Sequence, residues 1–73
     1  MSAVDQLLVF LLEDRRTVLD RMATAGYDED QLREAWDEAR ASGFTESTGL
    51  GADRLTEEGR SKARSLQEAD DTR

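Results

Sequence analysis

The pattern of apolar and polar positions predicts a first helix over residues 3 to 13. Apolar side chains recur there every three or four positions, which is the spacing of one face of an α-helix. The members of this face are Val4, Leu7, Leu8 and Leu11. Val9 and Leu12 fall on the opposite side, so the helix needs to be covered on two sides. We therefore expect Val9 and Leu12 to form a homodimer contact, unless the last helix of the chain folds over them.

A second helix is predicted over residues 15 to 25, after a break at Asp14. The register of the first helix would place Arg15 at a core position, and Asp14 is a suitable N-cap for a new helix. A single helix from 3 to 25 is the alternative, because the intervening segment contains no Gly or Pro. Gly26 is a typical C-terminal stop. The side chains expected to point inward are Val18, Leu19, Met22 and Ala25.

A third helix is predicted over residues 28 to 42. Asp28 and Gln31 match a variant of the capping box, in which two side chains satisfy backbone groups of the first turn. Gly43 then ends the helix. The apolar stripe of this helix consists of Leu32, Ala35, Trp36 and Ala39. From its place on the stripe, we expect Trp36 to be buried between the first and third helices.

Two short strands are predicted next, at about 44 to 48 and 53 to 56, with Gly49 and Gly51 in the turn between them. Strands this close in sequence form an antiparallel hairpin. The predicted fold class is therefore mainly α with a small β-hairpin.

Thr56 is expected to cap a last helix over about 57 to 68. The polar residues 69 to 73 are expected to form a disordered tail. The chain is thus predicted to be a single domain over residues 1 to 68.

Composition narrows the chemistry that this chain can perform. The 73 residues include no His and no Cys, which excludes His or Cys metal sites and nucleophiles that depend on either residue. A cation site built on Asp28, Asp30 and Glu34 lacks the loop spacing that such sites need. A chain of this length also offers no substantial cleft. We predict no catalytic residues, no metal site, no cofactor and no enzymatic activity.

The formal net charge is −7, from 17 acidic and 10 basic residues. A single Lys among many acidic, Ala and Thr residues is typical of proteins from GC-rich genomes, and it also resembles the composition of halophilic, haloarchaeal proteins. The one apolar run, residues 7 to 12, is too short to span a bilayer and lacks the flanks of a signal peptide. We therefore expect a cytoplasmic protein without a membrane partner.

The predicted order of three helices, a two-stranded hairpin and a further helix resembles winged helix-turn-helix domains. Residues 25 to 28 are similar to the turn before a recognition helix, and 41 to 44 to the start of the first wing strand. Residues 54 to 60 contain Leu-Thr-x-x-Gly, which resembles the exit from the wing in small MarR- and PadR-like transcription regulators. The resemblance covers residues 4 to 66.

The resemblance implies transcription regulation through double-stranded DNA. In that family pattern the helix over 28 to 42 enters the major groove, and residues 49 to 54 contact the backbone or minor groove. The candidate DNA-binding residues are Arg15, Arg16, Gln31, Arg33 and Arg54. The competing interpretation of each Arg is a solvated side chain paired with a nearby acid, as for Arg33 and Asp37.

The outward face of the third helix supports a second hypothesis. It carries Asp30, Glu34 and Asp37, where a DNA-binding helix would meet phosphates and base edges. The alternative function is protein–protein interaction, with this acidic face bound to a basic protein partner or mimicking DNA. One continuous strip of arginines would favour DNA binding. An uninterrupted acidic surface across the third helix and the wing would favour the protein partner.

Overall fold

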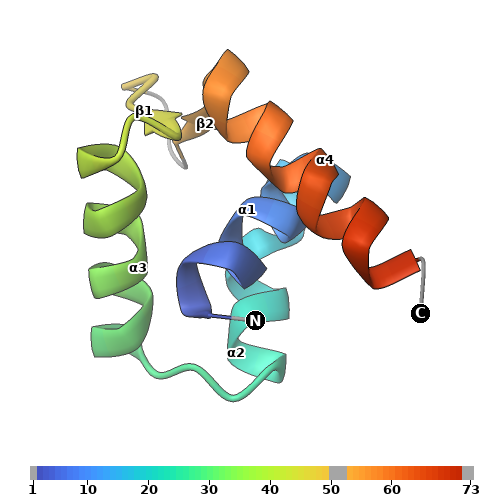
Figure 1. The fold of residues 1–73 in the computed structure, drawn as a ribbon. Coiled ribbons are helices and arrows are strands. Elements are labelled where there is room, and N and C mark those ends of the chain that lie inside the picture. The colour runs from blue at the N-terminus through green and yellow to red at the C-terminus, as the bar shows by residue number, and fades with distance from the viewer. Residues whose placement is uncertain (1, 50–52, 72–73) are drawn as a thin grey trace.

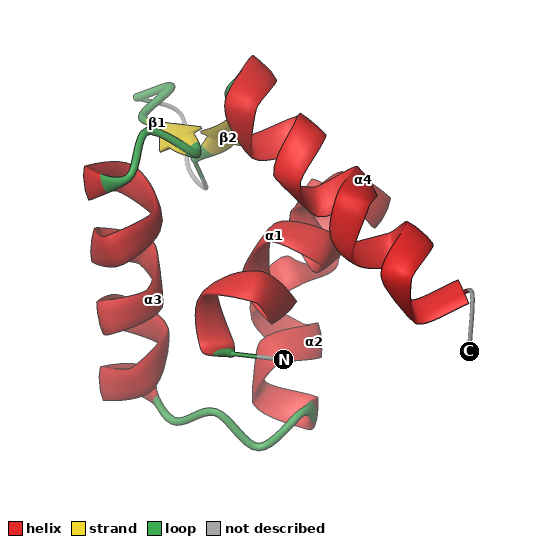
Figure 2. Cartoon of the chain, in the orientation of Figure 1, coloured by secondary structure: helices red, strands yellow, loops and turns green. Residues whose placement is uncertain are grey.

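The computed structural model describes residues 2 to 49 and 53 to 71. This part of the chain is mainly helical, with four α-helices and a two-stranded antiparallel hairpin (Figures 1 and 2). The elements are α1 (Ala3–Glu13), the 3-10 turn η1 (Arg15–Thr17), α2 (Val18–Thr24), α3 (Glu29–Ala41), β1 (Thr45–Glu46), β2 (Arg54–Leu55) and α4 (Glu57–Asp71). The prediction of a mainly helical chain with a small hairpin is confirmed.

Helix α1 is central in the fold, because α2, α3 and α4 all pack against it (Figure 1). Its Leu7 and Leu8 have no exposed surface. The buried core consists of Leu7, Leu8, Leu11, Val18, Met22, Ala35, Ala39 and Ala63. Leu12 and Val9 are partly buried, and Leu12 packs against this core. The cover that α1 requires therefore comes at least in part from within the chain, while the homodimer stays a prediction.

The break after α1 lies where the sequence predicts it. Asp14 is extended, and its carboxylate accepts the backbone N–H of Arg16 at 3.0 Å. The chain then forms η1 before α2, so the second α-helix is shorter than the predicted span of 15 to 25. The prediction that Leu19 and Ala25 point inward is wrong, since both are exposed. Val18 and Met22 already fill the inner face of so short a helix, and Leu19 lies about 100° round the helix from Val18.

Helix α3 begins with the predicted capping box. The Asp28 carboxylate accepts the Gln31 N–H at 2.8 Å, and the Gln31 side chain accepts the Asp28 N–H at 2.9 Å. The prediction that Trp36 is buried between the first and third helices is wrong, because Trp36 is only partly buried. Ala35 and Ala39 form the centre of the buried face, and Trp36 lies about 80° round the helix from that centre.

The hairpin pairs Thr45 with Leu55 and Glu46 with Arg54, in strands shorter than predicted. Its turn residues 50 to 52, including Gly51, lie outside the described residues. Helix α4 ends at Asp71 rather than near 68, so helix covers part of the segment for which a disordered tail is predicted.

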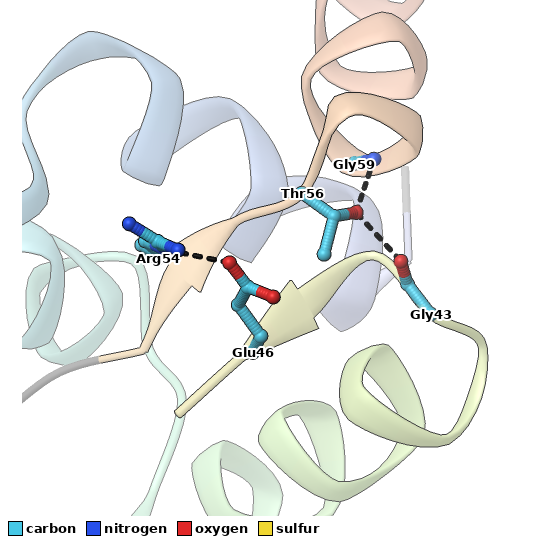
Figure 3. A network of polar contacts seen from close by, with 5 residues as sticks. All are labelled: Gly43, Glu46, Arg54, Thr56 and Gly59. Atoms are coloured by element: carbon cyan, nitrogen blue, oxygen red, sulfur yellow. Dashed lines mark hydrogen bonds and ion pairs between the residues drawn. The ribbon is translucent and has the colours of Figure 1, made fainter. Parts of the chain in front are cut away.

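Thr56 joins the hairpin to α4 (Figure 3). Its hydroxyl donates to the Gly43 carbonyl at 2.6 Å and accepts the Gly59 N–H at 3.1 Å, as expected of a helix cap. A Cβ at Gly59 would lie 1.9 Å from the Phe44 carbonyl oxygen, so the first turn of α4 contacts the backbone of the hairpin directly. These contacts explain the Leu-Thr-x-x-Gly pattern. Thr56 connects the segment before β1 to the first turn of α4 by hydrogen bonds, and Gly59 permits their close approach.

Candidate functional site

The outward side of α3 is an acidic face, formed by Asp30, Glu34 and Asp37. All three side chains are exposed, and none forms an ion pair with another described residue. They span about 10 Å along the helix, given its rise of about 1.5 Å per residue. The suggested pair between Arg33 and Asp37 is not present, so the interpretation of Arg33 as the partner of this carboxylate is wrong. Among the described residues, no cation therefore lies within ion-pair distance of these carboxylates.

A hollow of about 570 Å³ lies between α2 and α3, and none of the three carboxylates of the acidic face lines it. Its apolar wall is made by Leu19, Leu32 and Trp36, and we call it the apolar hollow. Leu19 is 51% exposed, although Leu is a residue that folding normally removes from water. The charged residues of its rim are Glu29, Arg33, Arg40 and Asp53. Three apolar side chains on two helices thus form an accessible patch whose rim carries two acidic and two basic residues.

One ion pair holds the rim of the apolar hollow. Arg40 donates from both Nε and Nη2 to Oδ2 of Asp53, at 3.1 and 2.8 Å. Asp53 is buried, with 5% of its surface exposed, while the Arg40 side chain is largely accessible. This pair connects the end of α3 to the residue that precedes β2. Sequence reasoning missed it, because an Asp after a glycine-rich turn has no pattern that distinguishes burial from exposure.

The five candidate DNA-binding residues do not share one surface. Arg15 and Arg54 line a separate hollow beside α1 and α4, whereas Arg33 lies on the rim of the apolar hollow. The Arg16 side chain is 91% exposed and lies 3.7 Å from Asp14. Gln31 is engaged in the capping box of α3. The structure therefore does not place these residues in one continuous strip along α3.

The described part of the hairpin also offers little free positive charge. Nε of Arg54 donates to Oε1 of Glu46 at 2.6 Å, across the two strands (Figure 3). A contact of this length between opposite charges partly neutralises the Arg54 guanidinium. Three of the six residues of the predicted wing segment 49 to 54, residues 50 to 52, lie outside the described residues.

Neither a group of metal-ligating side chains nor a membrane-spanning helix occurs among the described residues. There, no three side chains of the types His, Cys, Asp and Glu come together in a way that would hold a metal ion. Asp28, Asp30 and Glu34 are not such a group. Across residues 2 to 49 and 53 to 71, no helix has the length and apolar character to cross a membrane.

Comparison with known proteins identifies no relative of this chain: no protein-family model, no curated protein and no solved structure matches it.

Proposed function

We propose that this chain is a winged-helix-like protein-interaction domain that binds a basic segment of a partner protein along α3. The observation that carries the proposal is that one helix, α3, carries both the apolar wall of the apolar hollow and three unpaired carboxylates. The element order and the Thr56–Gly59 junction support the winged-helix-like part of the proposal.

The apolar hollow and the acidic face have different roles in the proposed binding. Trp is enriched among the residues that dominate binding energy, and Trp36 with Leu19 and Leu32 provides an apolar anchor site. The acidic face selects basic partners and speeds their approach, because complementary charge acts mainly on specificity and association rate. At about 1 M salt the Debye length is only about 3 Å. In such surroundings the apolar hollow supplies most of the affinity.

DNA binding along α3 is the weaker candidate. A duplex approaching this helix brings phosphates toward Asp30, Glu34 and Asp37. Each close approach of like charges costs on the order of 1 kcal/mol in a partly screened setting. The other basic residue lining this side of α3, Arg40, is engaged with Asp53, which leaves Arg33 to compensate. The resemblance to transcription regulators is therefore better explained by a shared scaffold than by a shared ligand.

The proposal is tested by affinity capture from a lysate of the native cells at their own salt concentration, with and without nuclease. Wild type is compared with Leu19→Ser, which changes an exposed side chain of the apolar hollow and leaves the core intact. Ala23→Ser is the matched control, because it alters an exposed residue of the same helix outside the hollow. We expect a nuclease-resistant protein partner that Leu19→Ser loses and Ala23→Ser retains.

A second measurement uses Trp36, the single Trp of the chain. Binding of the purified partner should move its emission to shorter wavelength and protect it from acrylamide, because the partner would exclude water from the hollow. A partner lost equally by both serine variants, or one that binds without changing Trp36, contradicts docking at this hollow. A partner that disappears with nuclease treatment would instead support nucleic-acid binding.

A further inference from the structure

A second hollow, of about 410 Å³, lies beside α1 and α4 on a different surface from the apolar hollow. Three leucines form part of its lining: Leu11, Leu12 and Leu55. The other lining residues are Arg15 of η1, Arg54 of β2, and Arg60 and Arg64 of α4. None of the described residues that line it is acidic, in a chain with 17 acidic residues. We call it the arginine hollow.

Three of the four arginines of this hollow are not paired with an acid among the described residues, and the fourth, Arg54, is paired with Glu46. Arg15, Arg60 and Arg64 form no ion pair with another described residue. Arg54 uses only its Nε to contact Glu46, which leaves its other donors available. Arg60 and Arg64 are one helical turn apart, a spacing at which like charges destabilise a helix. Glu57 and Glu68 line a neighbouring hollow of α4 together with Arg60 and Arg64 and offset part of this repulsion, and an anion bound among the four arginines would offset more of it.

We propose that the arginine hollow binds a compact phosphate-bearing ligand with an apolar body. A phosphomonoester carries close to two negative charges and three acceptor oxygens, so several guanidinium groups can share it. A carboxylate is satisfied by a single bidentate Arg. The apolar body of the ligand contacts Leu11, Leu12 and Leu55. This site does not overlap the α3 surface, and its test is independent of the proposed protein partner.

The charge distribution favours a small ligand over a nucleic-acid duplex. At physiological salt the Debye length is about 8 Å, so a compact anion in the hollow is affected mainly by the arginines that touch it. A duplex extends far beyond the hollow and meets the rest of a surface with net charge −7. The concave shape and the volume of about 410 Å³ also suit a small molecule.

The test is titration of the intact chain with phenyl phosphate, inorganic phosphate and a short DNA duplex, followed by amide chemical shifts in NMR spectra. Wild type is compared with Arg64→Gln and with Lys62→Gln. Lys62 is the matched control, because it is an exposed cation of the same helix that does not line the hollow. We expect saturable binding of phenyl phosphate with shifts at Leu12, Leu55 and Arg60, and weaker binding of inorganic phosphate.

Arg64→Gln should weaken phenyl phosphate about tenfold or more, since a hydrogen bond to a charged group is lost, while Lys62→Gln should change it less than twofold. Equal effects of the two variants would show unspecific attraction and overturn the proposal. Absence of saturable binding to wild type at millimolar concentration would overturn it as well. Tighter binding of the duplex, lost in Arg64→Gln, would reassign the hollow to the nucleic-acid backbone.

Discussion

The apolar hollow and the arginine hollow differ in charge more than the composition of the chain suggests. The first lies between α2 and α3, and its rim carries two acidic and two basic residues. The second lies beside α1 and α4 and gathers four of the ten basic residues without an acid in its lining. A net charge of −7 thus describes neither surface. Net charge bears on solubility and long-range attraction, whereas each binding surface is decided by the residues that the fold brings together.

The largest effect is expected from Gly59→Ala, which disrupts the junction on which the arginine hollow depends. The new Cβ would lie 1.9 Å from the Phe44 carbonyl oxygen, and a backbone atom cannot move aside cheaply. Overpacking of this kind should lower the free energy of unfolding by about 3 kcal/mol. Urea denaturation followed by circular dichroism measures it.

Ser61→Ala is the control for that experiment, because Ser61 is exposed on the same helix. It should stay within about 0.5 kcal/mol of wild type. Wild-type stability in Gly59→Ala would mean that α4 does not contact the hairpin as closely as the structure has it. If Gly59→Ala stays folded, its affinity for phenyl phosphate should fall, whereas the apolar hollow around Trp36 should be less affected.

The second effect concerns the apolar hollow, whose rim depends on Arg40 and Asp53. Arg40→Ala leaves a carboxylate that is only 5% exposed without its partner, and should cost about 2 kcal/mol of unfolding free energy. Asp53→Asn should cost less than about 1 kcal/mol, because the released Arg40 side chain is accessible to water. Thermal or urea unfolding of both variants measures the difference between their losses of unfolding free energy. Equal losses would show that Asp53 is not buried in solution.

The third effect tests the acidic face through the change Asp30→Asn, Glu34→Gln and Asp37→Asn. If a basic protein partner binds there, its affinity should fall about tenfold at low salt, which corresponds to about 1.4 kcal/mol. If α3 binds DNA, removal of three repulsive charges should strengthen duplex binding. Surface plasmon resonance with the partner and with a duplex distinguishes the two.

The matched control for the acidic face is Asp20→Asn, Glu57→Gln and Glu58→Gln, which changes the net charge equally with exposed residues of α2 and α4. It should leave the partner affinity within about twofold. Specific duplex binding by wild type that the α3 variant weakens would mean that these carboxylates contact bases, and the electrostatic argument against α3 would be wrong.

The sequence predicted the elements better than the surfaces. Local signals such as Asp14, Asp28 and Thr56 act within a few residues of the chain, so the breaks and caps they predict are present. Leu19 was predicted inward and is exposed, and Trp36 was predicted to be buried and is only partly so, because the buried face of each helix is decided by what packs against it. For α3 the close contact is made by small Ala35 and Ala39, which a hydrophobicity scale weights less than Trp.

Both hollows are products of tertiary structure and have no signal in a single sequence. Arg15, Arg54 and Arg60 are far apart along the chain and meet only because α4 packs on α1. The ion pair of Arg40 with Asp53 likewise joins the end of α3 to the residue that precedes β2. Helical wheels place residues on faces of one element, and they do not show which faces of different elements adjoin.

Leu12→Glu is expected to have the smallest effect on stability. This variant also connects dimerisation with the arginine hollow. Leu12 is partly buried in the lining of the hollow, so its loss costs part of a side-chain burial, of the order of 1 kcal/mol. The new carboxylate lies among four arginines and offsets much of that cost, which leaves a net change of less than about 1 kcal/mol. It should also compete with phenyl phosphate and weaken its binding.

Analytical ultracentrifugation over a wide concentration range decides the oligomeric state. A wild-type dimer that Leu12→Glu dissociates would confirm the α1 contact, and would show that the arginine hollow is covered in the dimer. A wild-type monomer, unchanged in Leu12→Glu, excludes that contact and leaves the hollow open to its ligand. Unweakened phenyl phosphate binding in the variant would place that ligand away from Leu12 and contradict the assigned site.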